Sequence, residues 1–125
     1  MRKRIELTWN NINTATINAD DTQTTDLIEV DIKLKRITAI IKVDNQGTPV
    51  SGDRVQVFMK PKINDFEASD TDLLVGVLDT MDDDPYQGFL LELPVGFDSF
   101  KFFLKNESST NNMIVSGVVY FETYT

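Results

Sequence analysis

Apolar and polar residues alternate with a period of two along most of this chain, which predicts β-strands and not helices. Turn-forming residues rich in Asn, Gly and Pro separate the alternating stretches. The predicted strands lie at residues 1–9, 27–43, 53–60, 73–78, 89–94, 99–106 and 113–124. About seven strands without a convincing helix predict an all-β fold. We expect an antiparallel β-sandwich, immunoglobulin-like or jelly-roll-like, with an open barrel as the alternative.

One long stretch changes its phase partway along. Between residues 27 and 34 the even-numbered side chains are apolar, and after Lys35 and Arg36 the odd-numbered side chains from Ile37 to Val43 take over. One extra residue in a period of two predicts a β-bulge, or a bend where the strand crosses from one sheet to the other.

Two other segments depart from simple alternation. Residues 73–78 form a continuous apolar run, which predicts a short strand buried on both faces. Residues 10–26 are rich in Asn, Thr and Asp and nearly free of large apolar groups, which predicts an extended polar arm. We therefore expect an N-terminal strand and arm over residues 1–26, followed by a single sandwich domain over residues 27–125.

The composition narrows the classes of function. The 125 residues are 41% hydrophobic, which suits one globular domain, and no apolar run reaches the ~18 residues of a membrane span. Cysteine and histidine are absent, which excludes disulfides, thiolate nucleophiles, the usual zinc sites and Ser-His catalysis. The first nine residues alternate and do not form the apolar core of a signal peptide. We expect an unexported protein that needs neither a membrane nor a cofactor.

The charge is acidic and unevenly distributed. Of the net −8, residues 1–62 hold ten Lys/Arg against eight Asp/Glu, whereas residues 63–125 hold two against twelve. An acidic surface repels phosphate backbones, so nucleic acid is not an expected partner. Arg2, Lys3 and Arg4 are the exception and could contact an acidic surface as part of a terminal arm.

The acidic loop residues suggest two possible chemistries, metal binding and catalysis. Asp79, Asp82 and Asp84 could supply oxygen ligands to calcium, which takes six to eight of them. Their run lacks the spacing and the terminal Glu of a dedicated calcium loop, so a solvated turn without metal is the preferred interpretation. No pattern places two carboxylates across a cleft, as a glycosidase requires, and we do not expect an enzyme.

Aromatic residues offer a second possible chemistry. Trp9, Tyr86, Tyr120 and Tyr124 could form a platform on which sugars stack. The alternating pattern already places Trp9 and Tyr120 in packing positions, so core and edge packing is the preferred interpretation.

The last two strands carry more apolar surface than one sheet face needs. Phe103 lies between two lysines on the face opposite Phe102, and the final strand is apolar on both faces. A two-layer sandwich buries one side of each sheet, so the second apolar side predicts a partner surface. The residues assigned to this interface are Phe103, Val115, Val119 and Phe121, with Arg2, Lys3 and Arg4 as additional contacts.

The closing block also resembles a known group of proteins. Gly88–Pro94, Phe100–Asn106 and Asn112–Phe121 are similar to the closing strands of small β-sandwich virion proteins of tailed bacteriophages. The resemblance covers mainly residues 50–125. It implies a non-enzymatic virion structural protein, most plausibly an auxiliary or decoration (cement) protein on a capsid. The alternatives are a tail-associated protein, or a β-sandwich module that binds carbohydrate or a host surface.

The same resemblance implies the partners and the location. Other virion proteins, capsid or tail subunits, would be the partners, together with further copies of the chain in a homo-oligomer. The protein would be made in the host cytoplasm and mounted on the virion.

Overall fold

The computed structural model describes residues 2–30, 34–80 and 87–123, the side chains of residues 87–89 excepted. Within these ranges the elements are all β-strands. Their bounds are β1 Arg2–Glu6, β2 Ala15–Ile17, β3 Thr22–Thr24, β4 Ile28–Glu29, β5 Leu34–Asn45, β6 Arg54–Ile63, β7 Phe66–Glu67, β8 Leu74–Asp79, β9 Gln87–Leu93, β10 Ser99–Asn106 and β11 Met113–Thr123.

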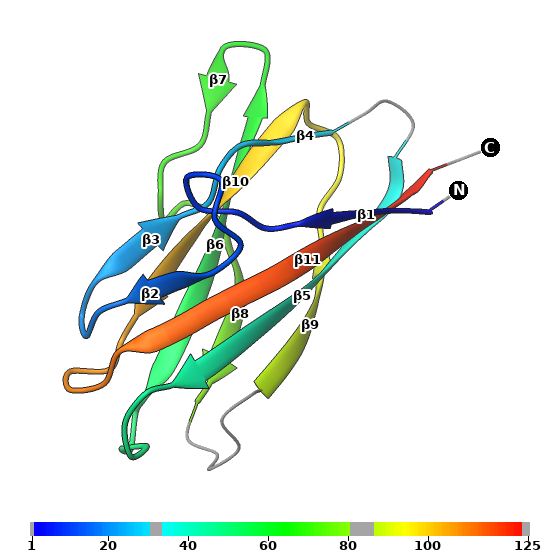
Figure 1. The fold of residues 1–125 in the computed structure, drawn as a ribbon. Helices are drawn as coiled ribbons and strands as arrows, with labels where there is room; N and C mark the ends of the chain where they lie inside the picture. The colour runs from blue at the N-terminus through cyan, green and yellow to red at the C-terminus, as the bar shows by residue number, and fades with distance from the viewer. Residues whose placement is uncertain (1, 31–33, 81–86, 124–125) are drawn as a thin grey trace.

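The strands form two antiparallel sheets that pack face to face (Figure 1). One sheet has the order β1-β11-β5-β9, and β2 also pairs with β11. The other has the order β3-β10-β6-β7, with β4 also paired to β10 and β8 also paired to β6. The expected antiparallel β-sandwich is confirmed, and its arrangement is jelly-roll-like.

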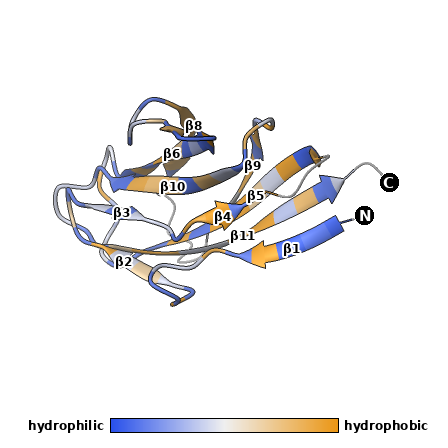
Figure 2. Ribbon diagram, turned by 90° about the horizontal axis from the view of Figure 1, so that it is seen from above, coloured by the Kyte–Doolittle hydropathy of each residue, from blue (hydrophilic) through white to orange (hydrophobic). Residues whose placement is uncertain are grey.

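The core lies between the two sheets and follows the period-two pattern. β5 and β10 contain both hydrophilic and hydrophobic residues (Figure 2), and along most of each strand buried side chains alternate with less buried ones. The largest fully buried side chains come from both layers and are Phe100, Phe102, Leu7, Ile17, Ile37, Ile41, Met59, Leu78, Leu104 and Met113. Burial of this apolar surface, at about 25 cal/mol per Å², is the main stabilising term.

The phase change near Lys35 is a β-bulge, as expected. β5 pairs Arg36 with Glu122 and Leu34 with Thr123, which leaves Lys35 as the extra residue. The chain also changes sheets just before this point, because β4 pairs with β10 whereas β5 pairs with β11. Both interpretations of the sequence pattern therefore apply to one segment.

Residues 10–26 contain two short strands, β2 and β3, which pair with β11 and β10 and so extend an edge of each sheet. The expectation for residues 73–78 was wrong. β8 is not buried on both faces: among the described strands it pairs with β6, and Leu74 and Val77 are about half exposed, at 48% and 49%. An apolar run at a sheet edge keeps one side in solvent. The described part of the chain contains no helix long and apolar enough to cross a membrane.

Candidate functional site

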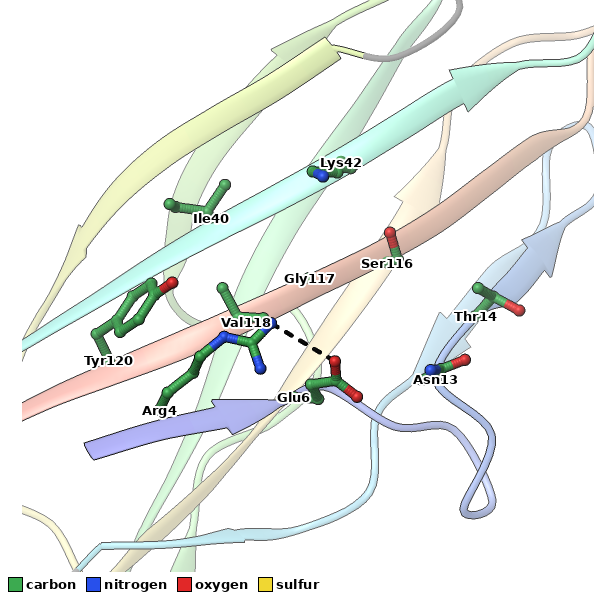
Figure 3. A pocket seen from close by; sticks show the side chains of 10 residues that line it. All are labelled: Arg4, Glu6, Asn13, Thr14, Ile40, Lys42, Ser116, Gly117, Val118 and Tyr120. Carbon is green, nitrogen blue, oxygen red and sulfur yellow. Dashed lines mark ion pairs between the residues drawn. The ribbon is translucent and has the colours of Figure 1, made fainter.

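A hollow of about 410 Å³ lies on the outward face of the β1-β11-β5 part of the sheet (Figure 3). We call it the face hollow. Three strands and the segment before β2 supply its walls. The residues that line it are Arg4, Glu6, Asn13, Thr14, Ile40, Lys42, Ser116, Gly117, Val118 and Tyr120.

The phase of β11 decides which of its side chains reach the hollow. Val115, Val119 and Phe121 point into the core and are 0%, 0% and 4% exposed. Ser116, Val118 and Tyr120 alternate with them and therefore face outward. The assignment of Val115, Val119 and Phe121 to a partner surface was wrong, because these three side chains already fill the sandwich interior.

Strand register brings the remaining residues beside β11. In β1, Arg4 lies opposite Tyr120 and Glu6 lies opposite Val118. In β5, Ile40 lies opposite Val118 and Lys42 lies opposite Ser116. Side chains directly opposite one another on a sheet face are about 5 Å apart at Cβ, so these pairs form neighbouring rows.

Gly117 permits a close packing contact beneath the hollow. A Cβ at this position would come within 2.7 Å of the Ile40 carbonyl oxygen and 2.9 Å of Leu7 Cδ1. The buried Leu7 side chain takes that space, and the Leu7 amide donates a hydrogen bond to the Gly117 carbonyl at 2.9 Å. The glycine therefore allows the chain to turn from β1 toward β2 close against β11.

Charged side chains lie along the β1 wall. Arg4 Nη2 is 3.5 Å from Glu6 Oε1, and both side chains are about half exposed, at 54% and 49%. The Arg2 guanidinium lies 4.3 Å from the centre of the Tyr120 ring, a cation–π contact. An exposed ion pair of this kind adds at most about 1 kcal/mol to stability, so both groups are available to a ligand.

The end of the hollow beside β2, on the same side of β11 as β1, depends on a tight turn that Asp26 holds. Asn10 and Asn11 adopt positive φ angles of 50° and 66° between the bridged residues Trp9 and Ile12. The backbone N–H groups of both asparagines donate to the Asp26 carboxylate at 2.9 Å. This turn leads directly into Asn13 and Thr14 at the hollow.

The same contacts set the protonation of Asp26. The Asn11 N–H and the Thr8 hydroxyl, which donates at 2.7 Å, are the main reasons that the pKa of Asp26 is lowered from 3.8. Hydrogen bonds to the charged form of a carboxylate favour that form. Asp26 is therefore ionised, and holds the turn, at neutral pH.

A second carboxylate with a lowered pKa lies in the loops around residues 45–53 and 106–112. Burial raises the pKa of Asp53, but hydrogen bonds from Ser108, the Val50 N–H, Asn45 and Asn111 outweigh burial and lower it from 3.8. Two of these donors, Asn45 Nδ2 and Asn111 Nδ2, lie at 3.0 Å from Asp53 Oδ2. Since donors and not oxygen ligands surround this carboxylate, it ties loops together and is not a metal centre.

The face hollow combines an apolar floor with a polar rim. Val118 and Ile40 form the floor beside the Tyr120 ring. Amide, hydroxyl and charged groups surround it on three elements. Glu6 is the one carboxylate among the described lining residues, whereas hydrolysis of glycosides uses a pair. The arrangement suits binding of a small amphipathic surface.

The structure separates the aromatic residues considered in the sequence. Tyr120 lines the face hollow, whereas Trp9 is only 6% exposed and belongs to the core. Tyr86 and Tyr124 lie outside the described residues. A shared platform of Trp9 and Tyr120 is therefore excluded, because the two rings serve different sides of the sheet.

The other predicted residues lie away from the hollow or at its border. Phe103 faces outward on the six-stranded sheet and contacts Phe58, with ring centres 6.1 Å apart. Lys3 alternates with Arg2 and Arg4 and lies opposite the inward-facing Phe121, so it does not line the hollow. A position for Phe103 on a sheet exterior is compatible with its predicted interface role, which stays a prediction.

The acidic loop yields no metal centre within the described chain. Asp79 lies at the end of β8, opposite Arg54 of β6. Asp82 and Asp84 lie outside the described residues. Among residues 2–30, 34–80 and 87–123, no three acidic side chains gather as metal ligands would.

Of the described residues that line the hollow, sequence reasoning missed eight. They are Glu6, Asn13, Thr14, Ile40, Lys42, Ser116, Gly117 and Val118. The phase of β5 contained part of the signal, because buried Ile41 and Val43 leave Ile40 and Lys42 on the outward face. The missing information was which strands lie beside β5.

Comparison with known proteins adds to this geometry. No family model and no curated protein sequence matches the chain. Among solved structures, it is similar to the C-terminal CBM6, a carbohydrate-binding module, of LamC, a marine laminarinase from Zobellia galactanivorans. That match has a TM-score of 0.60 and 11% identity, and it covers 96% of this chain and 100% of the module. A structure of infectious bursal disease virus matches with a TM-score of 0.57 and 10% identity over 99% of this chain but 37% of the viral chain.

These matches overturn the prediction that the chain is a bacteriophage virion protein. The chain shares its whole fold, end to end, with a carbohydrate-binding module, whereas the viral match is to part of a larger chain from a virus that the resemblance did not include. The expectation of a virion decoration protein was therefore wrong. Alternating strands separated by polar turns are typical of β-sandwiches in general and are not specific to virions. The fold is one whose carbohydrate-binding members are typically non-catalytic.

Proposed function

We propose that this chain is a non-catalytic carbohydrate-binding module that holds sugar rings in the face hollow. A sugar presents C–H surface on one side of its ring and hydroxyl groups around its edge. Aromatic and apolar side chains bind the first, and converging polar groups bind the second. The carrying observation is that the face hollow sets Tyr120, Val118 and Ile40 within one ring of polar side chains.

The whole-chain similarity to a carbohydrate-binding module supports the same proposal. The single carboxylate among the lining residues supports the non-catalytic part of it. The Arg4 guanidinium can donate two hydrogen bonds to neighbouring hydroxyl groups, and the Glu6 carboxylate can accept two from them, which would fix the orientation of the ring.

The test is retention of the protein on a panel of insoluble polysaccharides, followed by calorimetry on those that retain it. Tyr120→Ala should weaken binding at least about tenfold, since aromatic anchors commonly exceed 1 kcal/mol. Tyr120→Phe keeps the ring and should bind almost normally. Phe103→Ala, on the other sheet, is the matched control. Retention on no polysaccharide, or retention that Tyr120→Ala leaves intact, would reject the proposal.

A further inference from the structure

We propose that the face hollow selects an acidic sugar, one whose ring carries a carboxylate or a sulfate group, and that Lys42 binds this group. The inference rests on the proposed function and adds the class of ligand. It follows from the charges of the lining residues and from how those charges are paired.

Lys42 is a lining cation that has no counterion among the residues that the structure describes. It faces outward from β5 opposite Ser116, and its side chain is exposed at the hollow (Figure 3). No ion pair within 4 Å joins Lys42 to an acidic side chain of the described residues, including Asp44 two positions along the same face. Arg4, by contrast, already has Glu6 at 3.5 Å. An incoming anion would therefore displace none of the described acidic side chains from Lys42.

The charge of the hollow differs in sign from that of the whole protein. The lining carries Arg4 and Lys42 against Glu6, and Arg2 over the Tyr120 ring adds a third cation at the border. The chain as a whole has a net charge of −8. A recess of one sign with apolar walls concentrates ligands of the opposite sign.

Apart from Glu6, the described acidic residues on this sheet face lie outside the recess. Glu122 lies between Arg2 and Arg36 in its row, with one arginine opposite it on each neighbouring strand. Glu92 lies on β9, opposite Thr38. Neither residue lines the hollow. An acidic group over the Val118–Ile40 floor would meet Lys42 on one side and Arg4 on the other.

Lysines on the six-stranded sheet provide matched controls. Lys101 and Lys105 flank Phe103 on that outward face. Lys60, opposite Lys101, is already bound by Asp70 at 2.6 Å and lies 3.8 Å from Glu67. Replacing one of these lysines changes the net charge as Lys42→Gln does, but at a distance from the hollow.

The experiment compares three soluble polymers by calorimetry at low and high salt: polygalacturonate for carboxylate, a sulfated galactan for sulfate, and an uncharged β-glucan. The whole protein should bind at least one acidic polymer more tightly than the β-glucan, and added salt should weaken that binding. Lys42→Gln should reduce affinity for the acidic polymer by about tenfold, the effect of losing one charged hydrogen bond, and leave β-glucan binding unchanged. Lys105→Gln should change neither. Binding of only one acidic polymer supports the proposal and identifies its acidic group.

Three results would overturn the inference in distinguishable ways. Equal affinity for acidic and neutral polymers, with Lys42→Gln silent, removes the acidic preference but leaves the carbohydrate-binding module intact. Acidic binding that is lost in Lys101→Gln or Lys105→Gln and not in Lys42→Gln places the acidic site on the other sheet. Binding to none of the polymers, on the insoluble panel as well, rejects both the inference and the proposed function.

Discussion

The two outward faces of the sandwich are built alike but differ at their centres. β11 and β10 each run through the interior of a sheet, with strands on both sides. The outward side chains in the middle of β11 are Ser116 and Val118, whereas the middle of β10 carries Phe103, which packs on Phe58. Small central side chains leave a hollow, and a tilted aromatic pair fills the same place on the other face.

This difference shows how a flat element can become a binding surface. A sheet face is recessed where small residues are surrounded by large ones, and on the first face Tyr120, Arg4 and Lys42 supply the large ones. The connection from β1 to β2 adds a wall that the second face does not share. The comparison therefore predicts that a larger central side chain should remove binding from the first face. A smaller central side chain on the second face should instead remove packing.

The largest effect is expected when the hollow is filled. Val118→Phe places an aromatic ring on the floor, as Phe103 does on the other sheet, and should abolish retention on polysaccharides. The substitution faces solvent, so the free energy of unfolding should change by no more than about 0.5 kcal/mol. Affinity gels together with urea unfolding measure both. Val118→Ala keeps the hollow open and serves as the control; retained binding by Val118→Phe would place the site elsewhere.

A smaller effect, on stability, is expected below the floor of the hollow. Gly117→Ala should lower the free energy of unfolding by about 2 kcal/mol, because its Cβ meets the Ile40 carbonyl oxygen and the Leu7 side chain at under 3 Å. The neighbouring change Ser116→Ala points outward and should cost under about 0.5 kcal/mol. Urea unfolding of both variants tests this, and equal midpoints would mean that β11 adapts to a side chain at position 117.

The second face should respond in the opposite sense. Phe103→Ala removes one ring of the Phe58–Phe103 pair and should lower the free energy of unfolding by about 1 kcal/mol. Retention on polysaccharides should stay at the wild-type level. Thermal unfolding and affinity gels give the two measurements. Lost retention with unchanged stability would instead assign a binding role to this face.

Much of the fold could be predicted from the sequence, but which side of β11 faces the core and which side faces solvent could not. The bulge at Lys35 was visible because Ile37–Val43 has an unambiguous phase. β11 has no such phase, since Ile114 and Val118 alternate with Val115 and Val119. Apolar residues on both sides hide which set is buried, and this ambiguity led to the wrong interface.

The site depends on contacts that no local pattern contains. Arg4 and Tyr120 are more than a hundred residues apart in the sequence and adjacent in the sheet. Pairing of β1 with β11, and of β11 with β5, is needed before the hollow exists. Sequence periodicity gives the face of each strand but not its neighbours. The polar residues 10–26 illustrate the same limit, because their strands are short and stabilised by pairing with distant partners.

The smallest effect is expected at Asp26, which holds the turn beside the hollow but not the hollow floor. Because the pKa of Asp26 is lowered in the folded protein, its contribution to stability is present above its ordinary pKa of 3.8 and is lost as the pH falls through the lowered value. Asp26→Asn should therefore unfold at a lower urea concentration than wild type at neutral pH. The difference should shrink as the pH falls through that lowered pKa, where the wild-type carboxylate also becomes protonated. A difference that does not change with pH would show that the charge of Asp26 is not what holds the Asn10–Asn11 turn. Retention on polysaccharides at neutral pH should fall only slightly, because Asn13 and Thr14 form one wall while Tyr120 and the floor stay in place.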